Sequence, residues 1–424
     1  MVNKSLNIGF IRTRFAGTDG VSLETKKWVD VLTEIGHICY YFAGECDWSE
    51  DRRMIVPEAY YRHPEIKARH DGFFNKKTRT SEETYWIKDK ALYLKERLVE
   101  FVALFNVDVI ILENALTIPL NIPLGLAITE LIAESGIPAI AHHHDFAWER
   151  KRFLVNCLQD YIDMSFPPSL DGIQHVVINT HARQQLALRR GVGAMLIPNV
   201  MNYQKPPPTA DDYNADLRER LGLEPDEIFI LQPTRIVERK GIEHAIELVQ
   251  RLGKKARLVV SHASGDEGED YARRISSYAK LMGVNLICAE RFFDTTRGAG
   301  ENGEKIYNIW DAYIHSDLVT YPSVFEGFGN AFLEAVYFRK PIVVNNYSIY
   351  STDIKPKGFE VVEFDDYVTD ETVERTRAVI RDRELAARMA EVNFGLARKY
   401  FSYDMLRTNL KILLANAFGT NDIN

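Results

Sequence analysis

Cysteine is scarce in this sequence. Four occur among 424 residues, without a CxxC pair or any regular spacing: Cys39, Cys46, Cys157 and Cys288. This excludes a disulfide-stapled scaffold and a zinc module held by several cysteines, because both need more cysteines at closer spacing. We expect reduced thiols in a cytosolic protein.

Long apolar runs and a marked excess of one charge are also lacking. No stretch approaches the ~18 consecutive apolar residues that span a bilayer, and the opening "MVNKSLNIGF" has too short an apolar run for a signal peptide. The net charge is −8, from 52 basic and 60 acidic side chains spread along the chain. That balance favours neither nucleic acid nor an anionic membrane as a partner. We expect a soluble, cytoplasmic protein with small-molecule partners and no stable membrane insertion.

Short apolar runs alternate with amphipathic helical stretches, which is the pattern of β-α units around parallel sheets. The predicted strands are "LNIGFI", "HICYYF", "DVIILE", "PAIAHH" and "HVVIN", then "IFILQPT", "ARLVVSH", "VNLICA", "DLVTYPS" and "PIVVNN". The stretch "IPNVMNYQKPPPTADDYN" separates the two series as a connector. We predict an α/β protein with two Rossmann-like domains, residues 1–204 and 205–399, and a last helix, about 400–424, that packs back on the first domain.

Two stretches break the alternation. Residues 50–100 are charged and rich in aromatics, and they are predicted to form a helical insertion. Residues 291–308, "RFFDTTRGAGENGEKIYN", are predicted to form an irregular surface loop. Neither stretch is assigned to a sheet.

Two cations follow the first strand of the second series. In "QPTRIVERKGIEHAIELV", Arg235 leaves the strand, and Lys240 stands five residues later where a helix opens. Cations beside a helix N-terminus suit a pyrophosphate, because the first backbone N–H groups also attract anions. Open α/β sheets bind ligands at the carboxyl ends of their strands. A solvated basic turn is the alternative.

Two glutamates follow the strand "DLVTYPS". In "SVFEGFGNAFLEAVYF", Glu326 lies in a glycine loop, and Glu334 lies about two turns into the helix that follows. Carboxylates accept hydrogen bonds from vicinal hydroxyls, which sugars and ribose supply. With phosphate on the cations and hydroxyls on the glutamates, the ligand predicted from these residues is a sugar nucleotide. Surface charge is the alternative for an isolated pair.

The run E-G-F-G-N-A-F-L-E resembles the E-x7-E motif of retaining GT-B glycosyltransferases, in particular family four. The upstream R-x4-K and the segments "YPSVFEGFG" and "RKPIVV" stand in that family's order. The resemblance implies a GT-B fold, with two Rossmann-like domains facing each other across a cleft. It implies that the first domain binds the acceptor and the second binds the nucleotide-sugar donor.

The resemblance also implies roles for residues of the second domain. Glu334 corresponds to the ribose ligand, and Glu326 to the contact with hydroxyls of the donor sugar. Arg235 and Lys240 correspond to the diphosphate ligands that stabilise the leaving charge. Backbone groups near three further residues add donor contacts: Phe328, Gly329 and Asn330.

A glycine loop follows the first strand, in "FAGTDGVSLETKKW". It is not GxGxxG, and no acidic residue follows the second strand in the usual dinucleotide setting, which disfavours NAD. The loop is similar to the family's glycine loop, which implies that Gly20 approaches the donor phosphate or the acceptor. It implies that Thr18 and Asp19 bind acceptor hydroxyls. A plain turn is the alternative.

Three histidines end a strand in "AIAHHHDFAWERKRF". His142 and His144 share one face of the strand, so a metal site has to be considered. Because no further Cys, His or Glu cluster is apparent to complete the ligand set, we predict no metal. The resemblance implies that His144 and Asp145 match the family's "HD" beside the donor sugar, with His142 or His143 as the fallback.

Basic residues follow the histidines. Arg150, Lys151 and Arg152 are candidates to recognise an anionic acceptor, such as a phosphorylated sugar or a glycerate, with a solvated helix start as the alternative. For acceptor binding we predict Thr18, Asp19, Asp145, Arg150 and Arg152.

We predict a retaining hexosyltransferase that uses GDP-mannose or UDP-glucose and a small hydroxylated, anionic acceptor such as a glycerate or sugar derivative. The predicted catalytic residues are Arg235, Lys240, His144 and Glu326. The family's usual front-face attack needs no protein base, and no cofactor is required, although Mg²⁺ can assist. A GT-B epimerase or sugar phosphorylase is the alternative in the same fold. A non-enzymatic sugar-binding protein with two α/β lobes is disfavoured, because it should be exported.

Overall fold

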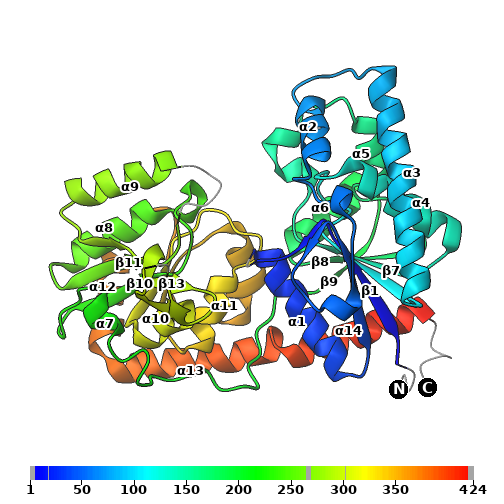
Figure 1. Cartoon of the computed structure of the whole chain (residues 1–424). Coiled ribbons are helices and arrows are strands. Elements are labelled where there is room, and N and C mark those ends of the chain that lie inside the picture. Colours follow the sequence, from blue (N-terminus) through cyan, green and yellow to red (C-terminus); the bar gives the residue numbers. More distant parts are fainter. Residues whose placement is uncertain (1–4, 18, 264–268, 301, 419–424) are drawn as a thin grey trace. The chain divides into compact units, whose positions relative to one another are not determined.

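The computed structural model describes residues 5–17, 19–263, 269–300 and 302–418 (Figure 1). The chain divides into two compact units. The first unit comprises Met1–Asn199 and Tyr403–Asn424, and the second comprises Val200–Ser402. The division after Asn199 lies five residues before the predicted boundary at 204/205.

The first unit is built on a seven-stranded parallel sheet of order β5-β3-β1-β6-β7-β8-β9. Its strands are β1 (Asn7–Ile11), β3 (Ile38–Ala43), β5 (Arg53–Ile55), β6 (Val109–Glu113), β7 (Ala139–His143), β8 (Ile173–Val177) and β9 (Ala194–Leu196). All five predicted strands of this half are present. The two that were not predicted, β5 and β9, are three-residue edge strands. Their apolar runs are too short to give a periodic signal.

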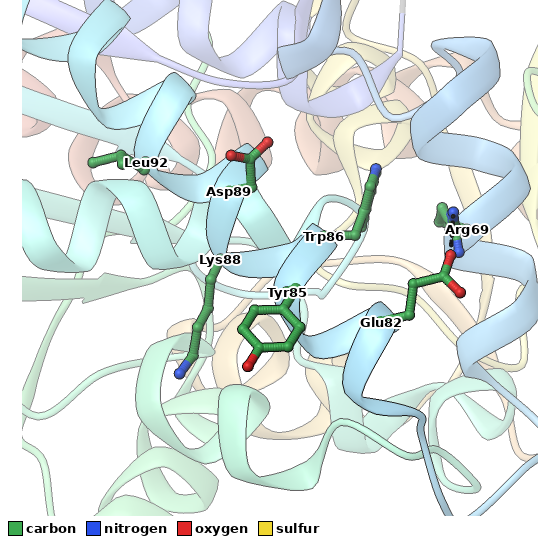
Figure 2. Close-up of a pocket in the computed structure, with 7 residues that line it drawn as sticks. All are labelled: Arg69, Glu82, Tyr85, Trp86, Lys88, Asp89 and Leu92. Atoms are coloured by element: carbon green, nitrogen blue, oxygen red, sulfur yellow. Dashed lines mark hydrogen bonds and ion pairs between the residues drawn. The ribbon is translucent and has the colours of Figure 1, made fainter.

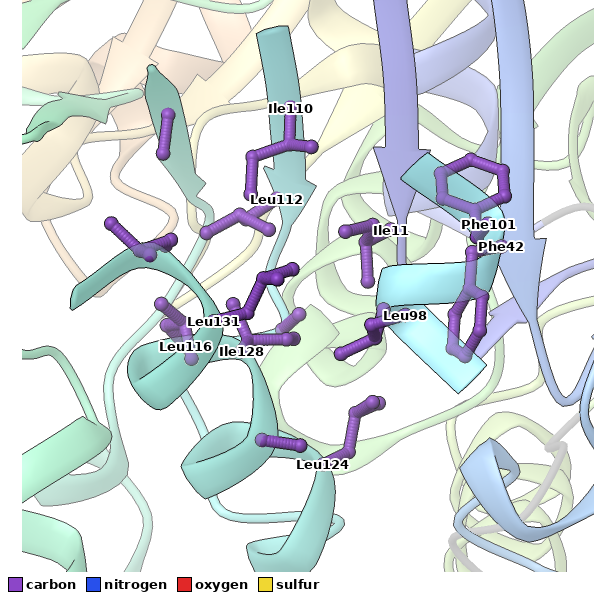
Figure 3. Close-up of a cluster of buried hydrophobic side chains, with 14 of the residues drawn as sticks. Ile11, Phe42, Leu98, Phe101, Ile110, Leu112, Leu116, Leu124, Ile128 and Leu131 are labelled. Atoms are coloured by element: carbon purple, nitrogen blue, oxygen red, sulfur yellow. The ribbon is translucent and has the colours of Figure 1, made fainter. Parts of the chain in front are cut away.

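Seven α-helices belong to the described part of this unit. They are α1 (Gly20–Glu34), α2 (Pro64–Phe73), α3 (Ser81–Leu104), α4 (Ile122–Ser135), α5 (Gln159–Ser165), α6 (Thr180–Arg190) and α14 (Tyr403–Phe418). α3 packs on α4, and α14, from the end of the chain, packs on α1. Figure 3 shows the core under α3 and α4, where Ile110 and Leu112 of β6 meet Leu98 and Ile128. Because strand side chains alternate, Glu113 points to the other face of β6.

The prediction of a helical insertion over residues 50–100 is confirmed for its helices, α2 and α3, and wrong in separating the stretch from the sheet. Within that range β5 joins the main sheet, where Met54 pairs with Phe42 of β3. α3 buries Leu94 and Phe101 in the core of the unit. The stretch resembles an insertion because its exposed face is highly charged. Its apolar residues recur with the period of a helix, and those of α3 pack toward the sheet.

The second unit is built on a six-stranded parallel sheet of order β12-β11-β10-β16-β17-β18. Its strands are β10 (Ile228–Gln232), β11 (Ala256–Val260), β12 (Leu286–Cys288), β16 (Leu318–Tyr321), β17 (Ile342–Asn345) and β18 (Val362–Phe364). Its helices are α7 (Leu217–Arg220), α8 (Ile242–Leu252), α9 (Glu269–Leu281), α10 (Ile309–His315), α11 (Asn330–Tyr337), α12 (Asp370–Arg381) and α13 (Arg383–Tyr400). Two parallel sheets with connecting helices confirm the predicted α/β class with two Rossmann-like domains.

Residues 291–308 are not the predicted irregular loop. They contain β13 (Phe293–Asp294), β14 (Gly298–Ala299) and β15 (Lys305–Asn308), which form a small sheet of order β13-β15-β14. Tyr307 of β15 is fully buried and donates a hydrogen bond to Asp216 (2.8 Å). One large aromatic side chain therefore ties this sheet to the unit, although its glycines and charges resemble a loop.

Across the described part of the chain, none of the helices combines the length and the apolar character that a membrane span requires. The four cysteines are free thiols.

Candidate functional site

The predicted donor residues of the second unit follow two neighbouring strands. β10 pairs in parallel with β16, so the segments after their carboxyl ends leave the same edge of the sheet. Arg235 and Lys240 follow β10, and Glu326 follows β16. This edge is where parallel α/β sheets bind ligands.

Lys240 and Glu326 form an ion pair through Nζ and Oε1, 86 residues apart in the chain. Both are buried, with 8% and 7% of their surface exposed. Arg239 adds a second cation, 3.3 Å from Oε2 of Glu326. Burial raises the pKa of Glu326, but the charges of Lys240 and Arg239 outweigh it and hold the pKa below its ordinary value. Glu326 is therefore an ionised carboxylate. Sequence reasoning missed Arg239, although it is adjacent to Lys240.

Two loops approach each other closely at this pair. Gly241 has φ +58°, and a Cβ atom there would lie 2.4 Å from the carbonyl oxygen of Pro322. Nearby, the Val324 amide donates to the Arg239 carbonyl (2.9 Å). A residue with a side chain would push the two loops apart, so the glycine is needed for Lys240 to meet Glu326.

α11 presents the second predicted glutamate. The helix begins at Asn330 after Gly329, whose φ is +134°. Glu334 is its fifth residue, one turn into the helix rather than the expected two. The Tyr313 hydroxyl donates to Glu334 Oε2 (2.9 Å) and orients the carboxylate. Phe328 is buried, and its carbonyl accepts from the Tyr347 hydroxyl (2.8 Å).

His262, two residues after the end of β11, lies near the cations of this site. The pKa of its imidazole is lowered by desolvation first, and then by the positive charges of Arg235 and Lys240. Its Nδ1 lies 2.7 Å from the Ser261 hydroxyl. His262 was not predicted, although its place just after a strand of the same sheet was a usable signal. The described residues thus gather a group of cations and two carboxylates in the segments that follow neighbouring strands of this sheet.

The glycine loop of the first unit starts α1. Gly20 is the first residue of the helix, and Asp19 is its N-cap, accepting from the amides of Val21 (3.1 Å) and Ser22 (3.2 Å). Asp19 also pairs with Arg12 (2.8 Å). Its carboxylate therefore holds the helix start, and it keeps its predicted acceptor role only if it exchanges these partners. Thr18 lies outside the described residues.

The histidine run splits between the two faces of the sheet. His142 stands opposite Glu113 in the β6–β7 register, with Nδ1 3.2 and 3.1 Å from the two carboxylate oxygens. His144 Nε2 lies 3.4 Å from Glu113 Oε2. The three residues form a group with the ligand types and spacing to hold a metal ion. The expectation that no further residue completes the histidine pair was wrong, because Glu113 lies 29 residues earlier in the chain.

His143 points to the opposite face of β7. Its Nδ1 lies 2.7 Å from the Thr117 hydroxyl, and its Nε2 lies 2.9 Å from Nδ1 of His175. Burial lowers the pKa of His143 well below its ordinary value, with the neighbouring histidines adding to the effect. His143 is therefore a neutral, buried histidine with a structural role.

Two of the predicted acceptor residues pair with each other. Asp145 forms an ion pair with Arg150 and accepts from Asn114 Nδ2 (3.0 Å). Arg152 is exposed and stacks on the ring of Phe153 at 4.6 Å. Its pKa is lowered by desolvation first and then by the charge of Arg150. The two guanidinium groups are therefore close, and Lys151 beside them is exposed.

A hollow of about 580 Å³ lies over α3 and is lined by none of the predicted residues (Figure 2). Its lining is Arg69, Glu82, Tyr85, Trp86, Lys88, Asp89 and Leu92. Glu82 is paired with Arg69 at 3.4 Å. Tyr85 is 73% exposed, so the hollow is shallow and open rather than a closed binding pocket.

Comparison with known proteins identifies relatives of this chain. Residues 302–393 match the family model "Glycosyl transferases group 1". The chain is 33% identical over 379 residues to a mannosylglucosylglycerate synthase of Petrotoga mobilis, covering 84% of this chain and 86% of that protein. It is 32% identical over 435 residues to the mannosylglucosylglycerate synthase of Thermotoga maritima, covering 95% and 98%.

The fold is similar to that of a glycosyltransferase from Rickettsia africae, with a TM-score of 0.69 and 14% identity over 98% of this chain and 99% of that one. The identity to full-length relatives shows the family, and the structural likeness shows the fold. The chain therefore belongs to the group 1 family of glycosyl transferases and is a glycosyltransferase with the GT-B fold.

Proposed function

We propose that this glycosyltransferase moves a hexosyl group, with retention of anomeric configuration, from a nucleoside diphosphate sugar to a small anionic acceptor of the glycosylglycerate class. The observation that carries the donor assignment is the buried meeting of Lys240 with Glu326, beside Arg239. The names of the two relatives support the acceptor class.

The second unit binds the donor in this proposal. Arg235 and Lys240 hold the diphosphate, together with the first amides of α11 near Phe328, Gly329 and Asn330. Lys240 has Glu326 as its anionic partner, so its charge is not buried unpaired. A diphosphate carries more negative charge than one carboxylate and competes for Lys240. Glu326, still held by Arg239, then turns its oxygens toward the sugar hydroxyls.

Glu334 accepts hydrogen bonds from the ribose hydroxyls. The Tyr313 hydroxyl donates to this carboxylate, and carboxylate oxygens are good acceptors for the hydroxyls of a vicinal diol. The first unit contributes Gly20, His144 and the basic residues Arg150 and Arg152. The histidine contacts the donor sugar, and the arginines attract the carboxylate or phosphate of the acceptor.

The chemical step exchanges one bond at the anomeric carbon for another. The bond to the phosphate oxygen breaks, and the phosphate leaves with the electron pair. The acceptor hydroxyl oxygen forms the new bond on the same face, and its proton passes to the departing phosphate. Lys240 and Arg235 stabilise the charge on the leaving group, which is electrostatic catalysis. No protein base and no required cofactor enter this step.

The relatives' names favour a mannosyl donor and glucosylglycerate as the acceptor, so we place GDP-mannose ahead of UDP-glucose. A thermal-shift panel of GDP, UDP and ADP tests the donor site. GDP is expected to raise the melting temperature most, with no Mg²⁺ added. If none of the three nucleotides raises it, the donor assignment fails. If only UDP raises the melting temperature, the donor is a uridine rather than a guanosine nucleotide, and the assignment of the donor site is retained.

A further inference from the structure

The group formed by Glu113, His142 and His144 is assembled by strand pairing. β6 and β7 run in parallel with Glu113 directly opposite His142. His144 follows two residues later and returns to the same side as His142. All three are buried, with 0%, 1% and 9% of their surface exposed. Two neighbouring strands thus bring one carboxylate and two imidazoles together inside the first unit.

The spacing of the three groups matches a coordination sphere. Zn²⁺ bonds of about 2.0–2.2 Å in a tetrahedral arrangement place neighbouring ligand atoms roughly 3.3–3.5 Å apart. Glu113 Oε2 lies 3.1 Å from His142 Nδ1 and 3.4 Å from His144 Nε2. One ligand atom from each of the three lies within 4.8 Å of the others.

Neighbouring residues contact both histidines. Trp28 of α1 stacks on His142 at 4.1 Å and 22°. The Asn114 side chain accepts from the His144 amide (3.0 Å), which fixes the backbone at this residue. These contacts limit the movement of the His142 ring and of the backbone at His144 before an ion arrives.

The charge of the group also favours a cation. A fully buried carboxylate is costly unless a positive charge offsets it. Two imidazoles and one carboxylate favour a first-row transition metal over Mg²⁺ or Ca²⁺, which prefer oxygen ligands. We infer that Glu113, His142 and His144 bind a divalent transition-metal ion such as Zn²⁺, with a fourth position left for water or a solute oxygen. This site goes beyond the proposed function, and its ion fixes the ring of His144 rather than acting in the transfer step.

Zn²⁺ and Co²⁺ are the probes for a test on the full-length chain. The protein is dialysed against EDTA, reloaded with Zn²⁺, desalted and analysed for metal, and the affinity is measured by competition with a chromophoric chelator. We expect one ion per chain, and visible d–d absorption when Co²⁺ replaces Zn²⁺. Glu113→Gln and His142→Gln should each weaken binding by about a hundredfold or more, because each removes a ligand. His175→Gln is the control: this buried histidine contacts His143 outside the group and should not change the affinity.

Two results would overturn the inference. One is a wild-type protein that retains no Zn²⁺ after desalting and shows no Co²⁺ absorption; the three residues are then a hydrogen-bonded His–Glu–His group. The other is equal affinity in wild type and both variants, which places the ion elsewhere. If a variant does not fold, the wild-type measurements decide alone. None of these metal-binding measurements uses donor or acceptor. A negative result therefore rejects the metal site without rejecting the proposed transferase function.

Discussion

Lys240 and Glu326 leave different strands of the second unit and meet as a buried ion pair beside Arg239. Neither residue is explained by the stability of the fold alone, because a buried ion pair seldom stabilises more than a well-packed apolar pair does. We propose that the pair is a charge arrangement kept for a ligand.

Lys240→Ala should lower turnover by about a hundredfold or more, since it removes a preorganised cation from the leaving diphosphate. Steady-state kinetics with saturating donor measure this effect. Lys255→Ala is the matched control, because Lys255 is an exposed lysine of the same unit paired with Asp226. Near-normal turnover in the Lys240 variant would remove this residue from the mechanism.

Glu334→Ala should weaken nucleotide binding by roughly tenfold through loss of the ribose contact. Calorimetry with GDP measures the affinity. Tyr313→Phe removes only the hydroxyl that orients Glu334 and should give a smaller loss. Glu247→Ala, on α8 with Tyr278 as its partner, should have no effect. Equal affinities in all three variants would contradict the assignment of Glu334.

Gly241→Ala should destabilise the second unit by about 1–3 kcal/mol, because the left-handed backbone and the approach of Pro322 leave no room for Cβ. Urea unfolding measures the loss. Gly72→Ala is the control: this glycine of α2 has open space at its Cβ position, so alanine should be neutral or slightly stabilising. Similar stabilities for both variants would show that the loops separate easily.

Arg152→Ala should raise the KM for an anionic acceptor roughly tenfold and leave the KM for the donor unchanged. The reason is that Arg150 is committed to Asp145, whereas Arg152 is exposed beside it. Arg183→Ala, exposed on α6, serves as the control. A rise in the donor KM instead would place Arg152 at the other substrate.

Acid should destabilise the first unit through His175. Burial lowers the pKa of this imidazole from 6.5 to about 4. Between these values the unfolded chain binds the proton and the folded chain does not, so the free energy of unfolding falls as pH falls, by roughly 3 kcal/mol in all. His175→Gln should flatten this part of the stability profile, whereas His181→Gln, on the surface of α6, should not. An unchanged slope in the His175 variant would refute the assignment.

Much of the fold could be predicted because buried parallel strands read as uninterrupted apolar runs. Every run predicted as a strand contains one, from β1 to β17. The failures were segments whose signal is short or mixed. β5, β9 and β18 have three residues each, and the β13-β15-β14 sheet is held by Tyr307 within a glycine-rich stretch.

The predicted site depended on residues that are close in sequence, and its gaps are residues that are close only in space. The spacing of Arg235 with Lys240, and of Glu326 with Glu334, could be read directly. Glu113 could not, because its partners lie on a neighbouring strand, and His262 was missed although it follows a strand of the same sheet. The order of strands in a sheet decides which strand ends meet, and no local pattern contains that order.

The product formed from GDP-mannose and glucosylglycerate tests the central claim most directly. Proton NMR of that product reports whether a new glycosidic bond forms and what its anomeric configuration is. We predict a single α-linked mannosyl product, with the configuration of the donor retained, and its loss in Lys240→Ala but not in Lys255→Ala. An inverted, β-linked product would contradict retention. No transfer from either GDP-mannose or UDP-glucose to this acceptor or its phosphorylated form would contradict the proposed function itself.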